Sequence, residues 1–243
     1  MEDRDHLPEI ILFVKAGADG KRYGACPFCQ RIFMILMHKS QEGLLHFKVA
    51  TVNLSKPPEE FKKAGLRRIP AIISADGGLD NVDDIVDYLD ANFPSTSLAY
   101  DNSTAEISCK DIFQKFCFFI KEVSKDSASL AIELKRLNQY IVNTNTKFLC
   151  SDHLCHLDCE VLPKIHHVRI ATMYLKNYKF PDELIGLKTY LTNAYNHEIF
   201  IKTCPSDQEI VFHWADKPET PTLSHERHSQ MIKEEPKYTF ALP

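Results

Sequence analysis

The chain has 243 residues, a formal net charge of −4 at pH 7 and 44% hydrophobic residues. This length allows two domains with buried cores, and the near-balanced charge argues against a nucleic-acid partner. No apolar run reaches the roughly eighteen residues of a membrane helix, and the acidic start does not resemble a secretory signal. Eight cysteines without such a signal favour a reducing, cytoplasmic location over an extracellular disulfide framework.

Residues 1–93 alternate short β-branched runs with helical patterns, which predicts a mixed sheet in the order β-α-β-α-β-β-α. The expected elements are a strand over 9–14, a helix over 26–39, a strand over 47–52, a short helix from Lys56, a strand after Pro70, a hairpin turn at 76–78 and a helix over 83–90.

Cys26-Pro27-Phe28-Cys29 lies between the first strand and an apolar helix. Pro27 suits the first helical turn, where its missing N–H costs nothing. Cys26 is then at the helix N-terminus, where unpaired amide groups and the helix dipole favour the nucleophilic thiolate. Cys29, one turn further on, can attack a mixed disulfide at Cys26 and resolve it. The alternatives are a structural cysteine pair or half of a zinc site, although no cysteine follows Cys29 until Cys109.

Ile69-Pro70 enters a hydrophobic strand, where proline does not suit an ordinary central position because it lacks an N–H. In thioredoxin-like folds this place holds a cis-proline that faces the active cysteine, and the neighbouring backbone pairs with a peptide substrate. The alternative is a trans-proline at the strand entry, since only a few per cent of X-Pro bonds are cis. Because Cys26 and Cys29 lie upstream in a Cys-x-x-Cys motif, we predict the cis form.

A polar, proline-containing linker over 94–101 separates this part from residues 102–215, where apolar residues recur at helical spacing. We expect an all-helical domain there. Beyond it the composition shifts to Pro, Glu, Lys, Ser and His, which predicts a mobile tail over 216–243.

Several segments between residues 9 and 212 match one known family. They include Leu12–Gly17, Cys26–Phe28, Thr51–Asn53, Leu162–His166, Tyr190–Tyr195 and Cys204–Pro205. In these segments the chain resembles the chloride intracellular channel (CLIC) proteins of the glutathione transferase structural superfamily. The resemblance implies a fold of class α/β plus all-α, with a thioredoxin-like N-terminal domain and an all-helical, glutathione-transferase-like C-terminal domain.

The resemblance also implies two activities. The first is glutaredoxin-like, glutathione-dependent thiol-disulfide exchange, with Cys26 and Cys29 as catalytic residues. The residues expected to position glutathione are Lys15, Phe28, Ile69, Pro70, Asp80 and Asn81. The second is reversible association of the cytoplasmic protein with membrane lipid, supporting chloride conductance. A non-enzymatic, redox-regulated membrane or cytoskeletal scaffold, with cytoskeletal proteins as partners, is the alternative.

Two departures from the family pattern affect these expectations. Glutathione transferases hold the γ-glutamyl end of glutathione with an acid followed by Ser or Thr, but Asn81-Val82 stands here. Asp80 is the candidate substitute, and we expect a weakened anchor. The segment that corresponds to the proposed membrane-crossing part, residues 26–52, contains His, Lys and Glu residues. Each charge near a bilayer centre costs about 2.5–3.5 kcal/mol, which disfavours spanning by a single helix.

Polar clusters in the second half have two interpretations. Residues of zinc-ligand type crowd together at Cys150, His153, Cys155, His156 and Cys159. The same stretch matches a helix-capping segment with Cys155 at the cap and Asp158 as the acid, so we predict no metal site. We expect His166, His167 and Arg169 to be surface or interdomain polar groups rather than catalytic ones.

Overall fold

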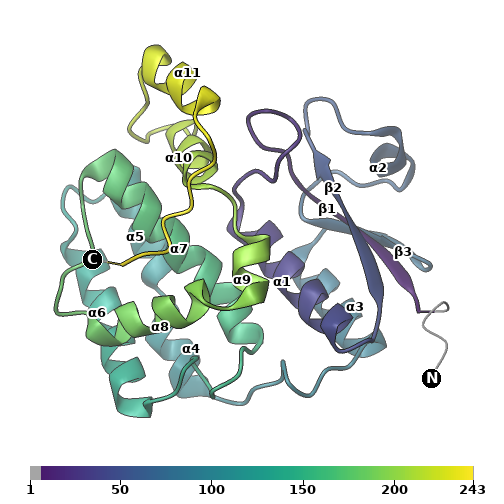
Figure 1. Cartoon of the computed structure of the whole chain (residues 1–243), viewed down its shortest axis with the longest axis horizontal. Coiled ribbons are helices and arrows are strands. Elements are labelled where there is room, and N and C mark those ends of the chain that lie inside the picture. Colours follow the sequence, from purple (N-terminus) through teal and green to yellow (C-terminus); the bar gives the residue numbers. More distant parts are fainter. Residues whose placement is uncertain (1–6, 243) are drawn as a thin grey trace. The chain divides into compact units, whose positions relative to one another are not determined.

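The computed structural model describes residues 7–242. The chain divides into two compact units, 1–96 and 97–243 (Figure 1). Across the part that the structure describes, no helix combines the length and the apolar character needed to cross a membrane.

The first unit has the predicted order of strands and helices. Its elements are β1 (Glu9–Lys15), α1 (Pro27–Gln41), β2 (His46–Val52), α2 (Glu59–Lys63), β3 (Ala71–Ser74), β4 (Gly77–Leu79) and α3 (Val82–Asn92). The strands form one sheet in the order β2-β1-β3-β4, in which β2 is parallel to β1, whereas β3 is antiparallel to β1 and β4. This is the thioredoxin-like arrangement that the sequence predicts.

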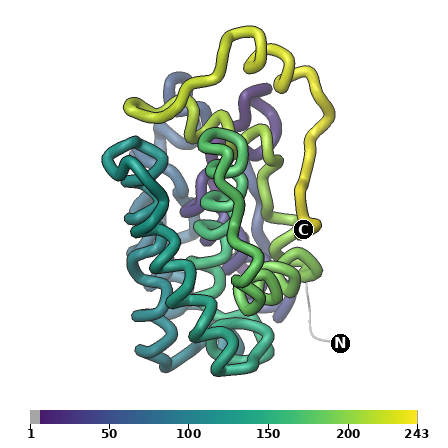
Figure 2. Tube along the Cα trace, turned by 90° about the vertical axis from the view of Figure 1, so that its left-hand side faces the viewer, coloured from purple at the N-terminus to yellow at the C-terminus, as the bar shows by residue number. Residues whose placement is uncertain are grey.

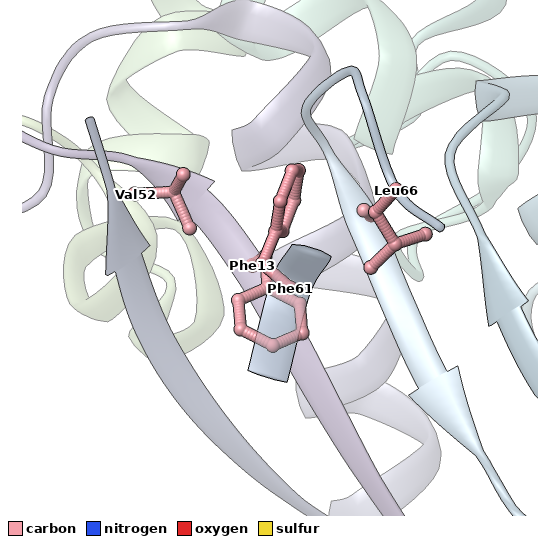
Figure 3. Packing of buried hydrophobic residues seen from close by; sticks show 5 residues of the cluster. Phe13, Val52, Phe61 and Leu66 are labelled. Atoms are coloured by element: carbon pink, nitrogen blue, oxygen red, sulfur yellow. The ribbon is translucent and has the colours of Figure 1, made fainter. Parts of the chain in front are cut away.

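The central strand β1 is covered on both faces. Leu12, Phe13 and Val14 are all buried, although successive side chains of a strand point to opposite faces. On one face Phe13 packs edge-to-face on Phe61 of α2, with ring centroids 5.4 Å apart. Figure 3 shows this cluster, in which Val52 and Leu66 also take part. The packing fixes the carboxyl end of β1, which carries the candidate site.

The second unit is helical, as predicted. Its helices are α4 (Ser103–Cys109), α5 (Ile112–Ile120), α6 (Ala128–Thr144), α7 (His156–Lys176), α8 (Ile185–Tyr195), α9 (Glu198–Thr203), α10 (Asp207–Ala215) and α11 (His225–Lys233). Helix α7 is buried over most of its length. At its start the Asp158 carboxylate accepts hydrogen bonds from the Cys155 backbone N–H and the Cys155 thiol, so Cys155 and Asp158 occupy the predicted capping positions.

The expectation that His166, His167 and Arg169 are surface or interdomain groups is wrong, because all three are buried within this helical unit. His166 Nδ1 lies 2.9 Å from the Tyr195 hydroxyl, and the Trp214 indole N–H donates to His167 Nδ1. Burial raises the cost of charge, and it lowers the pKa of His166 to about 3, with the nearby Arg169 acting in the same direction.

The segment expected to be a mobile tail has a defined structure up to residue 242. It forms α11, which buries Met231, and then an extended stretch that returns to the helices before it. Figure 2 shows this stretch as the yellow trace running back to the green helices. The polar composition did not predict this structure because the stretch is held mainly through backbone groups. Arg169, for example, donates hydrogen bonds to the carbonyls of Thr239 and Ala241.

Candidate active site

The loop after β1 brings the chain back against the strand before α1 begins. The Gly24 N–H donates to the Lys15 carbonyl over 2.7 Å, and Ala16 pairs with Tyr23. A Cβ on Gly24 would lie 2.3 Å from the Ala16 carbonyl oxygen, so only glycine allows this close approach. This role of Gly24 was not predicted from the sequence. Its position two residues before Cys26 was the one signal for a close approach of the backbone there.

Cys26 is the residue immediately before α1. Its backbone is extended, with φ −156° and ψ 115°, and Pro27 opens the helix as predicted. The pKa of Cys26 is lowered to about 7. The largest cause is the hydrogen bond from the Cys29 thiol, followed by the N–H groups of Cys29 and Phe28 and the charge of Lys15, while burial acts in the opposite direction. The lowered pKa favours the nucleophilic thiolate of Cys26.

Cys29 lies one turn into α1 and is buried, with 3% of its surface exposed. Burial is the main reason that its pKa is raised well above the ordinary thiol value, and its bond to the Cys26 sulfur adds to the effect. Both cysteines are free thiols in this structure. The pair thus combines a partly ionised, partly exposed nucleophile with a protonated, protected second thiol, the asymmetry that a two-cysteine mechanism requires.

The Ile69–Pro70 peptide bond is cis, as predicted. Strand β3 begins at the next residue, Ala71, which pairs with Phe13 of β1. Continuing this antiparallel register places Pro70 opposite Val14, beside the end of β1 from which the loop to Cys26 departs. Ile69 lies just outside the ladder, so its backbone N–H and C=O are not used by the pairing of β3 with β1.

Asp80, one of the residues expected to position glutathione, makes hydrogen bonds within the protein. Its carboxylate accepts hydrogen bonds from the backbone N–H groups of Arg67 and Arg68, at 2.8 and 3.0 Å, and from the Arg68 guanidinium. Partial burial would raise the pKa of Asp80, but these donors outweigh it and the pKa is lowered. Asp80 therefore ties the loop that carries Ile69 and Pro70 to the start of α3.

Asn81 is also engaged within the protein. Its side-chain oxygen caps α3 by accepting from the N–H groups of Asp83 and Asp84. Val82, the next residue, offers no polar group. The polar groups of Asn81 that the structure shows bonded thus serve the start of α3.

The remaining predicted site residues are Lys15 and Phe28. Lys15 ends β1 and lies close enough to Cys26 to favour its thiolate, which places it at the dithiol. The Phe28 side chain is 40% exposed, so it lies on the surface beside the two cysteines. Lys15, Phe28, Cys26 and Cys29 are thus brought together.

The second cysteine cluster has a different environment. Burial raises the pKa of Cys150 and of Cys155, and Cys155 donates its thiol hydrogen to Asp158. Within residues 7–242, no three His, Cys, Asp or Glu side chains converge in a way that could hold a metal ion. Cys155 and Asp158 form the cap at the start of α7.

A thioredoxin-like domain followed by an all-helical domain is the fold of the glutathione transferase superfamily. The profile described as the CLIC-like N-terminal domain matches residues 8–94. The chloride intracellular channel exl-1 of Caenorhabditis elegans is 36% identical over 241 residues, covering 97% of this chain and 100% of the relative. The chain belongs to the chloride intracellular channel family.

Solved structures agree with this fold. The CLIC homologue EXC-4 from C. elegans superimposes with a TM-score of 0.86 at 24% identity, covering 100% of this chain and 92% of the other. The dehydroascorbate reductase of Chlamydomonas reinhardtii gives a TM-score of 0.73 at 22% identity, covering 84% of this chain and 96% of the other. At these identities the likeness concerns the fold alone.

Proposed function

We propose that the protein is a glutathione-dependent thiol-disulfide oxidoreductase with Cys26 as nucleophile and Cys29 as resolving thiol. The observation that carries this proposal is the partly ionised Cys26 sulfur, with its pKa near 7, at the start of α1. Lys15, Phe28 and the backbone of Ile69 beside Pro70 are the groups that would position glutathione.

The reaction follows from the two different thiols. The Cys26 thiolate attacks the glutathione sulfur of a mixed disulfide and releases the other partner as a thiol after protonation. Cys29 then loses its proton and attacks the sulfur of Cys26, which forms the Cys26–Cys29 disulfide and releases glutathione. Two glutathione molecules restore both thiols and leave as glutathione disulfide, so electrons balance over the cycle.

The test is reduction of a glutathionylated peptide by glutathione, measured for the wild type and three variants. Cys26→Ser is expected to lose the activity, whereas Cys29→Ser retains a single-thiol reaction. Cys109→Ser is the matched control because burial raises the pKa of Cys109 to about 12, and it should equal the wild type. An unchanged rate in the Cys26→Ser protein would refute the proposal.

Chloride conductance after association with a membrane is the second candidate function, because the relative at 36% identity is named a chloride intracellular channel. In this case the Cys26–Cys29 pair acts as a redox switch. The test is chloride efflux from anionic liposomes with the reduced protein, the oxidised protein and the Cys26→Ser variant. Efflux that depends on oxidation in the wild type supports the switch. Vesicle binding without efflux would favour the alternative of a redox-regulated membrane or cytoskeletal scaffold. Binding to cytoskeletal proteins would then be measured in a separate experiment.

A further inference from the structure

The loop that leads into α7 carries a second pair of cysteines whose side chains meet. Cys150 is partly exposed, whereas Cys155, five residues further on, is 2% exposed. Both are free thiols in this structure. The Cys155 side chain forms a hydrogen bond with the Cys150 sulfur. One accessible and one buried thiol are therefore in contact, an arrangement that Cys26 and Cys29 also show.

The Asp158 carboxylate holds the backbone of this pair together. One of its oxygens accepts from the Leu149 N–H and the other from the Cys155 N–H, both at 3.0 Å. Leu149 is the residue before Cys150, so the two cysteines are fixed to the same carboxylate. A disulfide forms only where the Cα atoms of two cysteines approach within about 7 Å. Bridging by a single carboxylate favours such an approach.

The chain between the two cysteines is a tight turn with hydrogen bonds of its own. The Phe148 N–H donates to the Ser151 carbonyl at 2.9 Å. The Ser151 hydroxyl accepts from the His153 N–H and donates to the His153 carbonyl, both at 3.0 Å. None of these bonds uses a sulfur atom. The turn therefore keeps Cys150 beside Cys155 in the reduced protein, and closure of a disulfide requires little movement of the loop.

The two thiols ionise less readily than Cys26. Burial is the main reason that the pKa of Cys150 is raised; the hydrogen bond from Cys155 opposes this effect and the charge of Asp158 adds to it. Burial, followed by the charge of Asp158, also raises the pKa of Cys155. Since the thiolate is the nucleophile, Cys150 is expected to react more slowly than Cys26.

We propose that Cys150 and Cys155 form a second redox-active dithiol, which glutathione disulfide oxidises more slowly than the first. Cys150 loses its proton, and its thiolate attacks one sulfur of glutathione disulfide and releases the other glutathione, which takes up a proton. The Cys155 thiol then loses its proton and attacks the Cys150 sulfur. This step forms the Cys150–Cys155 disulfide and releases the second glutathione as a thiol. Two protein thiols are oxidised and one glutathione disulfide is reduced, so atoms and electrons balance.

Oxidation of this pair also changes the start of α7. The Cys155 thiol donates to the Asp158 carboxylate at 3.1 Å, and a disulfide sulfur has no hydrogen to donate. The carboxylate keeps its bonds from the Leu149 and Cys155 N–H groups and from the Tyr190 hydroxyl. The disulfide therefore removes one of the hydrogen bonds at the helix cap, which links the redox state of the pair to the cap. The proposal is independent of the activity proposed for Cys26.

The test uses the full-length protein with Cys26→Ser and Cys29→Ser, in which the first pair cannot react. The reduced protein is incubated with glutathione disulfide, unfolded in acid, alkylated with N-ethylmaleimide and digested with trypsin. The fragment 148–164, which ends at Lys164, contains Cys150, Cys155 and Cys159. It should be two hydrogen atoms lighter and carry a single alkyl group, which mass-spectrometric fragmentation should place on Cys159.

Three further variants of this protein separate the steps. Cys155→Ser should accumulate glutathione on Cys150, because the resolving thiol is missing. Cys150→Ser should leave Cys155 without glutathione, because that thiol is buried. Cys159→Ser is the matched control, since Cys159 is also a buried cysteine of the same fragment, and it should form the same disulfide. In the wild type at pH 7, the second disulfide should form about tenfold more slowly than the first, or slower still.

Three alkylated thiols in the fragment after prolonged incubation with excess glutathione disulfide at alkaline pH would overturn the proposal. A disulfide that includes Cys159, or glutathione on Cys155 in the Cys150→Ser protein, would overturn the assignment of the pair. Equal rates for the two disulfides in the wild type would overturn their order. Amide hydrogen exchange at Leu149 and Cys155 should be faster in the oxidised protein. Equal exchange in the two forms would overturn the link to the helix cap.

Discussion

The thiol of buried Cys29 donates a hydrogen bond to the sulfur of Cys26, and this contact is the main reason that the pKa of Cys26 falls to about 7. In the proposed mechanism, the second cysteine therefore activates the first before it resolves the mixed disulfide. A protein with a non-donating residue at the second position would have the same fold with a less reactive nucleophile.

Replacing Cys29 with Ala is therefore expected to raise the pKa of Cys26 towards the ordinary thiol value of about 8.5. Alkylation of Cys26 by iodoacetamide at pH 7, followed by mass spectrometry, should slow about tenfold because the thiolate fraction falls. In the wild type the rate should rise with pH to a midpoint near 7, since ionisation produces the nucleophile. A midpoint that stays near 7 in Cys29→Ala would contradict the role given to Cys29.

Asp80 should act as a positioning residue for the loop that carries Pro70. Asp80→Ala removes the acceptor for the N–H groups of Arg67 and Arg68 and is expected to cost about 1–3 kcal/mol of unfolding free energy. Turnover of the glutathionylated peptide should fall while the Cys26 pKa stays near 7. Asp84→Ala, an exposed carboxylate in the first turn of α3, is the control and should cost less than about 1 kcal/mol. A shifted Cys26 pKa in Asp80→Ala would instead indicate a direct electrostatic role.

Acid should destabilise the protein through His166. Its folded-state pKa is about 3, below the unfolded value of 6.5, so between these values the unfolded chain binds a proton that the folded protein excludes. From pH 7 to pH 5 this linkage lowers the unfolding free energy by about 2 kcal/mol, measured by urea denaturation. His166→Gln should lose that part of the pH dependence, whereas replacement of the exposed His153 should not. Equal pH dependence in all three proteins would show that another group dominates.

At the start of α7, we expect the cap to tolerate Ser in place of Cys155 but not the loss of the Asp158 carboxylate. Asp158 is buried and also accepts from the Leu149 N–H and the Tyr190 hydroxyl, so Asp158→Ala leaves several buried donors unpaired. We expect a loss of about 3 kcal/mol or more in unfolding free energy. Cys155→Ser keeps a donor to Asp158 and should remain within about 1 kcal/mol of the wild type. A severe loss in Cys155→Ser would show that the size of sulfur matters more than the cap.

The sequence by itself determined the order of elements in the first unit and the start of α1 at Pro27, because these depend on local patterns. Strand alternation and a proline in the first helical turn each constrain the backbone within a few residues. The cis bond before Pro70 and the cap formed by Cys155 and Asp158 were predicted from likeness to known folds instead, since a proline at a strand entry is trans in most proteins.

Only the tertiary structure decided what the polar residues do. Asp80 and Asn81 are adjacent to a helix start, but the N–H groups that occupy Asp80 belong to a loop twelve or more residues away. Arg169 and His166 lie mid-helix with no local sign of burial, since the residues that cover them come from α8, α9 and the stretch 235–242. That segment lacks an apolar pattern because its backbone makes most of the contacts, and backbone hydrogen bonding across the chain leaves no trace in composition.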